Sequence, residues 1–124
     1  MENEFYKDLS QNRLVINDRY HLTSKISSGG MGSVYQAQDA LLNNKIVAIK
    51  MLHGELCKDP ENIKDFMREV SILQSINHPN VLRIFDIGAD KGTFYYTMEY
   101  IEGTKLEDYY KSKQKRILVI AISL

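Results

Sequence analysis

One segment of this chain has the periodicity of a helix, and strand patterns flank it on both sides. Apolar residues recur at spacings of three and four between residues 60 and 76, as they do along one face of an α-helix. Asp59-Pro60-Glu61 supplies a start, because aspartate caps helices well, proline suits the first turn and glutamate favours the positive helix end. Asn77-His78-Pro79-Asn80 supplies a stop, since the residue before a proline disfavours helix. One helix between strands favours an α+β arrangement.

Three strand patterns precede this helix and two follow it. The turn signals between them are the glycine-rich Ser27–Gly32, the pair Asn43-Asn44 and the stretch Gly88–Gly92. Strands joined by short turns pair antiparallel, so we expect a five-stranded antiparallel sheet with one packed helix. The expected strands are residues 19–26, 33–40, 46–52, 81–87 and 93–101. In the last of them, the residues that alternate onto one face are Phe94, Tyr96, Met98 and Tyr100.

Composition argues against several classes of protein. Acidic and basic residues number 16 each, and a formal net charge of zero argues against a general nucleic-acid binder, which must neutralise phosphates. The longest apolar run, Ile117–Leu124, is broken only by Ser123 and is far shorter than the roughly 20 residues that a membrane-spanning helix needs. Cys57 is the single cysteine, which excludes an intrachain disulfide and fits a reducing compartment. We therefore expect a cytoplasmic protein with no nucleic-acid partner and no membrane segment.

Two charged residues fall on apolar surfaces and therefore need partners. Lys50 lies near the end of the apolar strand 46–52, on the same face as Ala48, and a lysine there is costly unless its charge is paired. Glu69 shares a face with apolar helix residues, and Asp65, one turn earlier, is a like charge. Lys50 is the obvious cation for Glu69. Taken singly, a lysine snorkelling at a strand end and a solvated glutamate explain the two residues as well.

Two backbone features could bind a nucleotide. Glycines in the turn before residue 33 would let N–H groups approach phosphate oxygens, although a plain hairpin turn explains them too. The segment Met98–Gly103 runs from a strand into a connector that ends on glycine, and its backbone could bind a flat heterocycle. An ordinary strand end is the alternative interpretation of that segment.

Together these motifs resemble the protein kinase family. The family signature is a glycine-rich loop with a following valine, then Val-Ala-Ile-Lys, then a helix glutamate. This chain has Ile26–Tyr35, Val47-Ala48-Ile49-Lys50 and Arg68-Glu69 in that order, followed by His78–Val81 and Met98-Glu99-Tyr100. The wording Gly29-Gly30-Met31-Gly32-Ser33-Val34-Tyr35 is most similar to eukaryotic-type serine/threonine kinases of bacteria. The resemblance covers roughly residues 19 to 110.

The resemblance implies a role for each matched residue. Lys50 would contact the α- and β-phosphates of ATP while paired with Glu69, and these two are the expected catalytic residues. The glycines that would let the loop cover the phosphates are Gly29, Gly30 and Gly32. The residues that would surround the adenine are Ile26 at its rim, Val34 and Ala48 on its faces, the gatekeeper Met98, and the backbone of Glu99 and Ile101. Ser27 departs from the family, which usually has its first glycine there.

The family's catalytic His-Arg-Asp and its magnesium-binding Asp-Phe-Gly do not occur in these 124 residues, so we expect no metal ligands. Asp86-Ile87-Gly88 precedes the hinge and is interpreted as a strand end and turn. We expect a polar, loose leader over 1–18, an ATP-binding small lobe over 19–103, and the truncated start of the large lobe or an aberrant tail over 104–124.

The implied partners are ATP and, in the complete family, magnesium and a protein substrate whose serine or threonine is phosphorylated. The chain alone would be an inactive ATP-binding lobe. The alternative is a non-catalytic protein-interaction module or a pseudokinase-like fragment.

Overall fold

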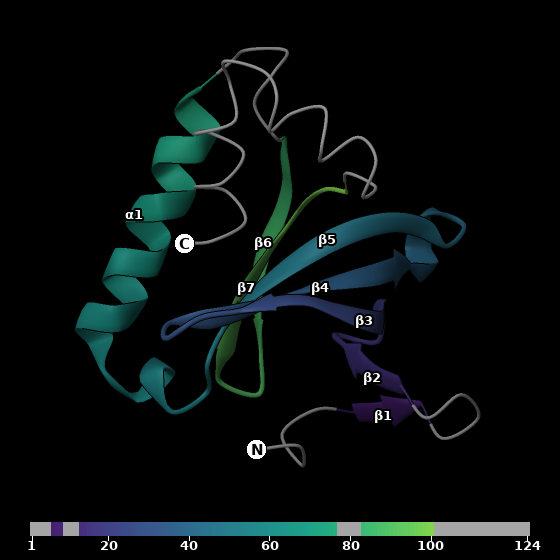
Figure 1. Cartoon of the computed structure of the whole chain (residues 1–124), viewed down its shortest axis with the longest axis horizontal. Helices are drawn as coiled ribbons and strands as arrows, with labels where there is room; N and C mark the ends of the chain where they lie inside the picture. The colour runs from purple at the N-terminus through teal and green to yellow at the C-terminus, as the bar shows by residue number, and fades with distance from the viewer. Residues whose placement is uncertain (1–5, 9–12, 77–82, 101–124) are drawn as a thin grey trace.

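The computed structural model describes residues 6–8, 13–76 and 83–100, which form one curled antiparallel sheet with one α-helix beside it (Figure 1). The strands lie in the order β1-β2-β3-β4-β5-β7-β6. Their bounds are β1 Tyr6–Asp8, β2 Arg13–Ile16, β3 Tyr20–Ser28, β4 Gly32–Asp39, β5 Lys45–Leu52, β6 Ile84–Asp90 and β7 Thr93–Glu99. The helix α1 covers Pro60–Ser75, and two short 3₁₀ helices are η2 Ala40–Leu42 and η3 Leu56–Lys58. The predicted α+β class, an antiparallel sheet with one packed helix, is confirmed.

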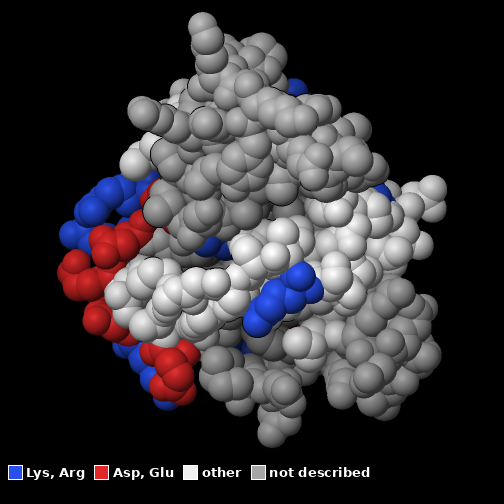
Figure 2. All heavy atoms as spheres, viewed as in Figure 1, with Lys and Arg blue, Asp and Glu red and all other residues white. Residues whose placement is uncertain are grey.

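The helix forms where the sequence predicts it, between Pro60 and Ser75. The Asp59 side chain accepts a hydrogen bond from the Glu61 backbone N–H at 2.9 Å, which satisfies one of the N–H groups that a helix start leaves unpaired. Its apolar stripe, Phe66, Val70 and Leu73, is buried against the sheet, whereas charged side chains gather over its outer face (Figure 2).

The sheet separates two apolar clusters because successive strand residues point to opposite faces. On β5, Ala48 and Leu52 belong to the cluster beneath α1, whereas Val47, Ile49 and Met51 belong to the cluster on the other face. The predicted alternation along β7 is also present. Its Tyr96 and Met98 are buried in the helix-side cluster, with Phe94 and Tyr100 packed against it.

The sheet has seven strands in its described part, not the expected five, because the leader contributes two. Within residues 1–18, β1 and β2 extend the sheet at its β3 edge, and Val15 and Ile16 are almost completely buried. The expectation of a loose leader was therefore wrong for these strands. The short apolar run Leu14-Val15-Ile16 does not stand out in the sequence because the residues around it are mostly polar. After this run, Asn17 and Asp18 turn the chain, with φ angles of 52° each.

Two predicted turns are shorter in the structure. Only Gly29–Met31 lie between β3 and β4, because Ser27 and Ser28 pair within β3 and Gly32 within β4. The stretch from Gly88 to Asp90 belongs to β6, so the Asp86-Ile87-Gly88 sequence is strand and not a turn. The hairpin turn is Lys91-Gly92, whose φ angles of 49° and 83° match the two-residue turns that suit twisted strands.

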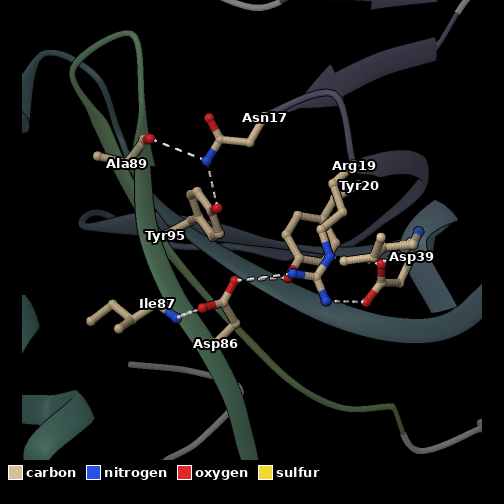
Figure 3. Close-up of polar contacts among 9 residues, drawn as sticks. Asn17, Arg19, Tyr20, Asp39, Asp86, Ile87, Ala89 and Tyr95 are labelled. Carbon is tan, nitrogen blue, oxygen red and sulfur yellow. Dashed lines mark hydrogen bonds and ion pairs between the residues drawn. The ribbon is translucent and has the colours of Figure 1, made fainter.

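A polar network on the face away from α1 ties the β2–β3 turn to β6 and β7 (Figure 3). Asn17 donates from its side chain to the Tyr95 hydroxyl at 2.7 Å, and Tyr20 donates to the Asp86 carboxylate at 2.9 Å. Arg19 donates two hydrogen bonds of 2.8 Å to the buried Asp39 carboxylate. The contacts of Asn17 and Tyr20 hold the amino-terminal strands in place against strands that are more than 60 residues away in sequence.

We predict that Asp39→Asn lowers the free energy of unfolding at neutral pH by about 1.5 to 3 kcal/mol, the range for hydrogen bonds to charged groups. The Arg19 guanidinium holds the pKa of the Asp39 carboxyl below its ordinary value. The stabilisation is therefore present above the unfolded-state pKa of about 4 and is lost as the pH falls through the lower folded-state pKa.

Urea unfolding from pH 7 to pH 3 measures this difference. Asp65→Asn is the control, because Asp65 forms an exposed ion pair with Arg68, at 3.4 Å, and such pairs contribute little. A stability difference for Asp39→Asn that stays undiminished at pH 3 would contradict the assignment.

Candidate nucleotide-binding site

The register of three neighbouring strands assembles the predicted site on the helix-facing side of the sheet. Lys50 on β5 pairs with Val34 on β4 and with Tyr96 on β7, and Ala48 pairs with Met98. Directly paired residues in an antiparallel sheet point to the same face. The predicted adenine residues Val34, Ala48 and Met98 are therefore brought together beside Lys50, and all three are buried in one cluster.

The predicted ion pair between Lys50 and Glu69 is present. The Lys50 ammonium donates to Glu69 Oε1 at 2.9 Å, and the side chains are 2% and 13% exposed. Burial lowers the pKa of Lys50, and the hydrogen bond and charge of Glu69 oppose that shift. The helix carries Glu69 to this position because Phe66, Val70 and Leu73, on the same face of α1, are buried against the sheet. Glu69 therefore offsets part of the cost of burying the ammonium.

Tyr96 forms a hydrogen bond with this ion pair, although no sequence motif assigns a chemical role to it. Its hydroxyl donates to the same Glu69 Oε1 at 2.5 Å, and the side chain is fully buried. Burial and the Glu69 charge both raise the pKa of Tyr96, so it stays a neutral donor. The sequence could have indicated this contact through the place of Tyr96 on the same strand face as Met98. A tyrosine hydroxyl that is buried there usually has a hydrogen-bond partner.

The glycine-rich turn has distinct requirements at its individual glycines. The Gly29 backbone N–H donates to the Gly32 carbonyl at 2.9 Å and closes the hairpin. A Cβ at Gly32 would lie 2.3 Å from the Met51 carbonyl oxygen, so glycine is required there by close packing on β5. A Cβ at Gly30 would meet no described atom within 4 Å, so the turn is open at that residue. Gly32 thus shapes the turn, and Gly30 leaves room for a ligand to approach.

The turn is also fixed by the segment that follows β5. The His53 backbone N–H donates to the Met31 carbonyl at 3.1 Å. The His53 ring contacts the Ser33 hydroxyl at 3.1 Å, and Ser33 in turn contacts the Ser28 hydroxyl at 3.1 Å. These contacts anchor both strand ends of the hairpin next to the exposed tip at Met31.

The predicted rim residue lies on β3, and the predicted hinge lies where the described residues end, after residue 100. Ile26 is 40% exposed on β3, as expected for a residue at a rim. The Glu99 backbone N–H donates to the Arg83 carbonyl at 2.9 Å, so contact between Glu99 and an adenine edge would use the Glu99 carbonyl oxygen. Ile101 and the motif His78–Val81 lie outside the described residues.

A cavity of about 460 Å³ lies between the turn tip and α1. It is lined by Met31, Asp65, Phe66, Arg68, Glu69, Ile72 and Leu73. Of the predicted site residues that the structure describes, only Glu69 borders this cavity, so the cavity lies beside the expected adenine position and does not coincide with it. Its size falls in the usual range for small-molecule sites.

The donor set of the candidate site fits a nucleotide phosphate. A buried ammonium beside an open glycine turn suits an anion. Among the described residues, no group of three or more His, Cys, Asp or Glu side chains could hold a metal. In the same part of the chain, no helix is long and apolar enough to cross a membrane.

Comparisons with known proteins identify the family to which a chain with this fold and site belongs. The family model of the protein kinase domain matches residues 20–120. The solved kinase domain of Mycobacterium tuberculosis PknI, in a form with one substitution, superposes with a TM-score of 0.58 and 24% identity, covering 79% of this chain and 40% of that one. At that identity the superposition supports the fold alone.

Several curated relatives of this chain are bacterial serine/threonine kinases. The chain is 40% identical over 94 residues to serine/threonine-protein kinase PrkC of Bacillus subtilis, covering 76% of this chain and 14% of the relative. It is 36% identical over 95 residues to the probable serine/threonine-protein kinase PknB of Lactococcus lactis, covering 77% and 15%. This chain belongs to the protein kinase family, and its matched part spans about one seventh of the length of these relatives.

We predict that Glu69→Ala lowers the free energy of unfolding by about 3 kcal/mol, because it leaves a buried cation without its partner. Lys50→Met should cost less, since an apolar side chain of similar length replaces the ammonium and Glu69 keeps the Tyr96 hydroxyl. Urea unfolding measures both.

The control is Glu55→Ala, which breaks an exposed pair with Lys58, at 3.3 Å, and should change stability little. Equal costs for Glu55→Ala and Glu69→Ala would show that the Lys50–Glu69 pair does not support the fold.

Proposed function

We propose that this chain is the ATP-binding lobe of a serine/threonine protein kinase. The observation that carries the proposal is the buried Lys50–Glu69 pair, 2.9 Å long, beside a glycine turn that is open at Gly30. A buried lysine is costly, and its retention on a ligand-facing surface is explained if an anion is bound there. The proposed lobe spans 19–103, with β1 and β2 attached to its sheet.

In this proposal the chain's own residues bind and orient the nucleotide. The Lys50 ammonium donates to the α- and β-phosphates, and Glu69 keeps it charged and pointed at them. Val34 and Ala48 enclose the adenine together with Met98, and Ile26 covers its rim. The glycine turn, Gly29 to Gly32, lies over the phosphates, and the hinge residues Glu99 and Ile101 hold the adenine edge through their backbone. ATP itself supplies the phosphoryl group that the complete family transfers.

Phosphoryl transfer requires groups that these 124 residues do not contain. The family uses an aspartate in His-Arg-Asp to accept the substrate proton and the aspartate of Asp-Phe-Gly to hold magnesium. We therefore propose nucleotide binding for this chain. For a protein that also has the two missing motifs, we propose transfer of the phosphoryl group from ATP to a serine or threonine of a protein substrate. The same proposal includes a cytoplasmic location. It also includes the absence of a nucleic-acid partner, which the zero net charge supports.

We expect ATP to raise the thermal unfolding temperature of the wild-type chain, because a ligand that binds only the folded state stabilises it. Lys50→Met should weaken ATP binding at least about tenfold, the loss expected when a charge-assisted hydrogen bond is removed. Isothermal titration calorimetry gives the dissociation constants.

Lys45→Met is the matched control, because Lys45 lies on the same strand but is exposed and stacks over Phe85 at 4.6 Å. It should bind ATP as wild type does. A wild-type chain with no measurable ATP binding would reject the proposal and favour the alternative, a non-catalytic interaction module or pseudokinase-like fragment.

We also expect the purified chain to transfer no radiolabelled phosphate from ATP to a protein acceptor, with or without magnesium. The physical reason is the missing pair of aspartates, for which the described residues offer no substitute metal site. Transfer that is abolished by Lys50→Met would contradict this expectation, because it would mean that the lobe supplies a base of its own.

A further inference from the structure

The helix-facing side of the sheet contains a third polar group beside the ion pair. We propose that Tyr96 is a positioning residue for the nucleotide site: its hydroxyl holds the Glu69 carboxylate in line with the Lys50 ammonium before any nucleotide binds. The inference rests on the proposed function, since it assigns a role to a residue that acts through Glu69 and not on the ligand. Tyr96 is not among the residues that the sequence motifs single out.

The geometry joins the three groups at one atom. Glu69 Oε1 accepts the Tyr96 hydroxyl at 2.5 Å and the Lys50 ammonium at 2.9 Å. Tyr96 and Lys50 are paired in register on β7 and β5, so both donors start from neighbouring points of the sheet. Glu69 comes from the helix, and the sheet thus holds a helix carboxylate with two donors.

The tyrosine ring is fixed on the sheet side of this contact. Tyr96 is fully buried, and its ring packs against Phe66 of α1 with centroids 5.4 Å apart. Phe66 lies three residues before Glu69, on the same helix face. The ring therefore sets the distance between β7 and α1, and the hydroxyl sets the direction of the carboxylate.

Glu69 needs such a constraint because it is not fully enclosed. Its side chain is 13% exposed, whereas that of Lys50 is 2% exposed. A glutamate side chain is flexible and can exchange its lysine for water, whereas a buried tyrosine ring has few rotamers available. A second, rigid donor on the same oxygen holds the carboxylate in the buried position.

A purely structural role for Tyr96 would need only its ring, and Tyr95 provides the comparison. Tyr95 is the preceding residue on β7, is almost equally buried, and accepts a hydrogen bond from Asn17 at 2.7 Å. It belongs to the cluster on the opposite face of the sheet, away from Glu69. Removing the hydroxyl of either residue deprives a buried tyrosine of a hydrogen bond. Of these two hydroxyls, only that of Tyr96 contacts the ion pair.

The test compares Tyr96→Phe with Tyr95→Phe in the whole 124-residue chain. The pKa of Lys50 is followed by ¹³C NMR of the lysine ε-carbon, assigned through Lys50→Met, and ATP affinity is measured by calorimetry. Tyr96→Phe should lower the pKa of Lys50, because a carboxylate that turns to water no longer offsets burial of the ammonium. It should also weaken ATP binding about tenfold. Tyr95→Phe should change neither quantity.

An unchanged or raised Lys50 pKa in Tyr96→Phe would overturn the inference, since it would mean that Glu69 stays on Lys50 unaided. A wild-type chain that binds no ATP would reject the proposed function, and the Lys50 pKa would still decide the role of Tyr96. If Tyr96→Phe does not fold, a second measurement on the wild-type chain replaces it. NMR should then show a slowly exchanging tyrosine hydroxyl proton whose chemical shift changes in Glu69→Gln. The absence of that proton signal would overturn the inference.

Discussion

A buried ammonium on the face of a sheet is stable only if a carboxylate reaches it, and this requirement connects the sheet of this protein to its helix. Lys50 is 2% exposed and receives its counter-charge from Glu69, across the boundary between β5 and α1. The helix can supply that carboxylate only in one rotation about its axis, the one that buries Phe66 and Leu73 against the sheet. Apolar packing and the ion pair therefore select the same docking of the helix.

The two faces of the sheet carry different polar contacts. On the helix side, hydrogen bonds converge on Glu69, next to the residues that we propose for nucleotide binding. On the other side, Arg19 and Asp39 form a partly buried pair, and Asn17 joins the β2–β3 turn to the β6–β7 hairpin. The second network holds strands that extend the sheet. The contacts that fasten the amino-terminal strands are therefore separate from those that build the proposed site.

The glycines show how one motif can combine structural and functional demands. Gly32 lies so close to the Met51 carbonyl that no side chain fits, which would make this position a glycine even without a ligand. Gly30 has no such neighbour among the described atoms and is the residue at which the turn stays open. A glycine-rich motif thus supports a binding hypothesis most at the position where packing does not already explain it.

The sequence by itself determined the local and periodic features of this protein. The helix with its Asp59 cap, the faces of β5 and β7, and the pairing of Lys50 with Glu69 follow from spacing and from the cost of burying an unpaired charge. The tertiary structure alone decided that residues 6–8 and 13–16 join the sheet, because their pairing depends on partners and not on the short apolar run itself. It also decided that the Tyr96 hydroxyl meets Glu69, 27 residues away in sequence. Strand register and helix docking set that contact, and neither is encoded in a local pattern.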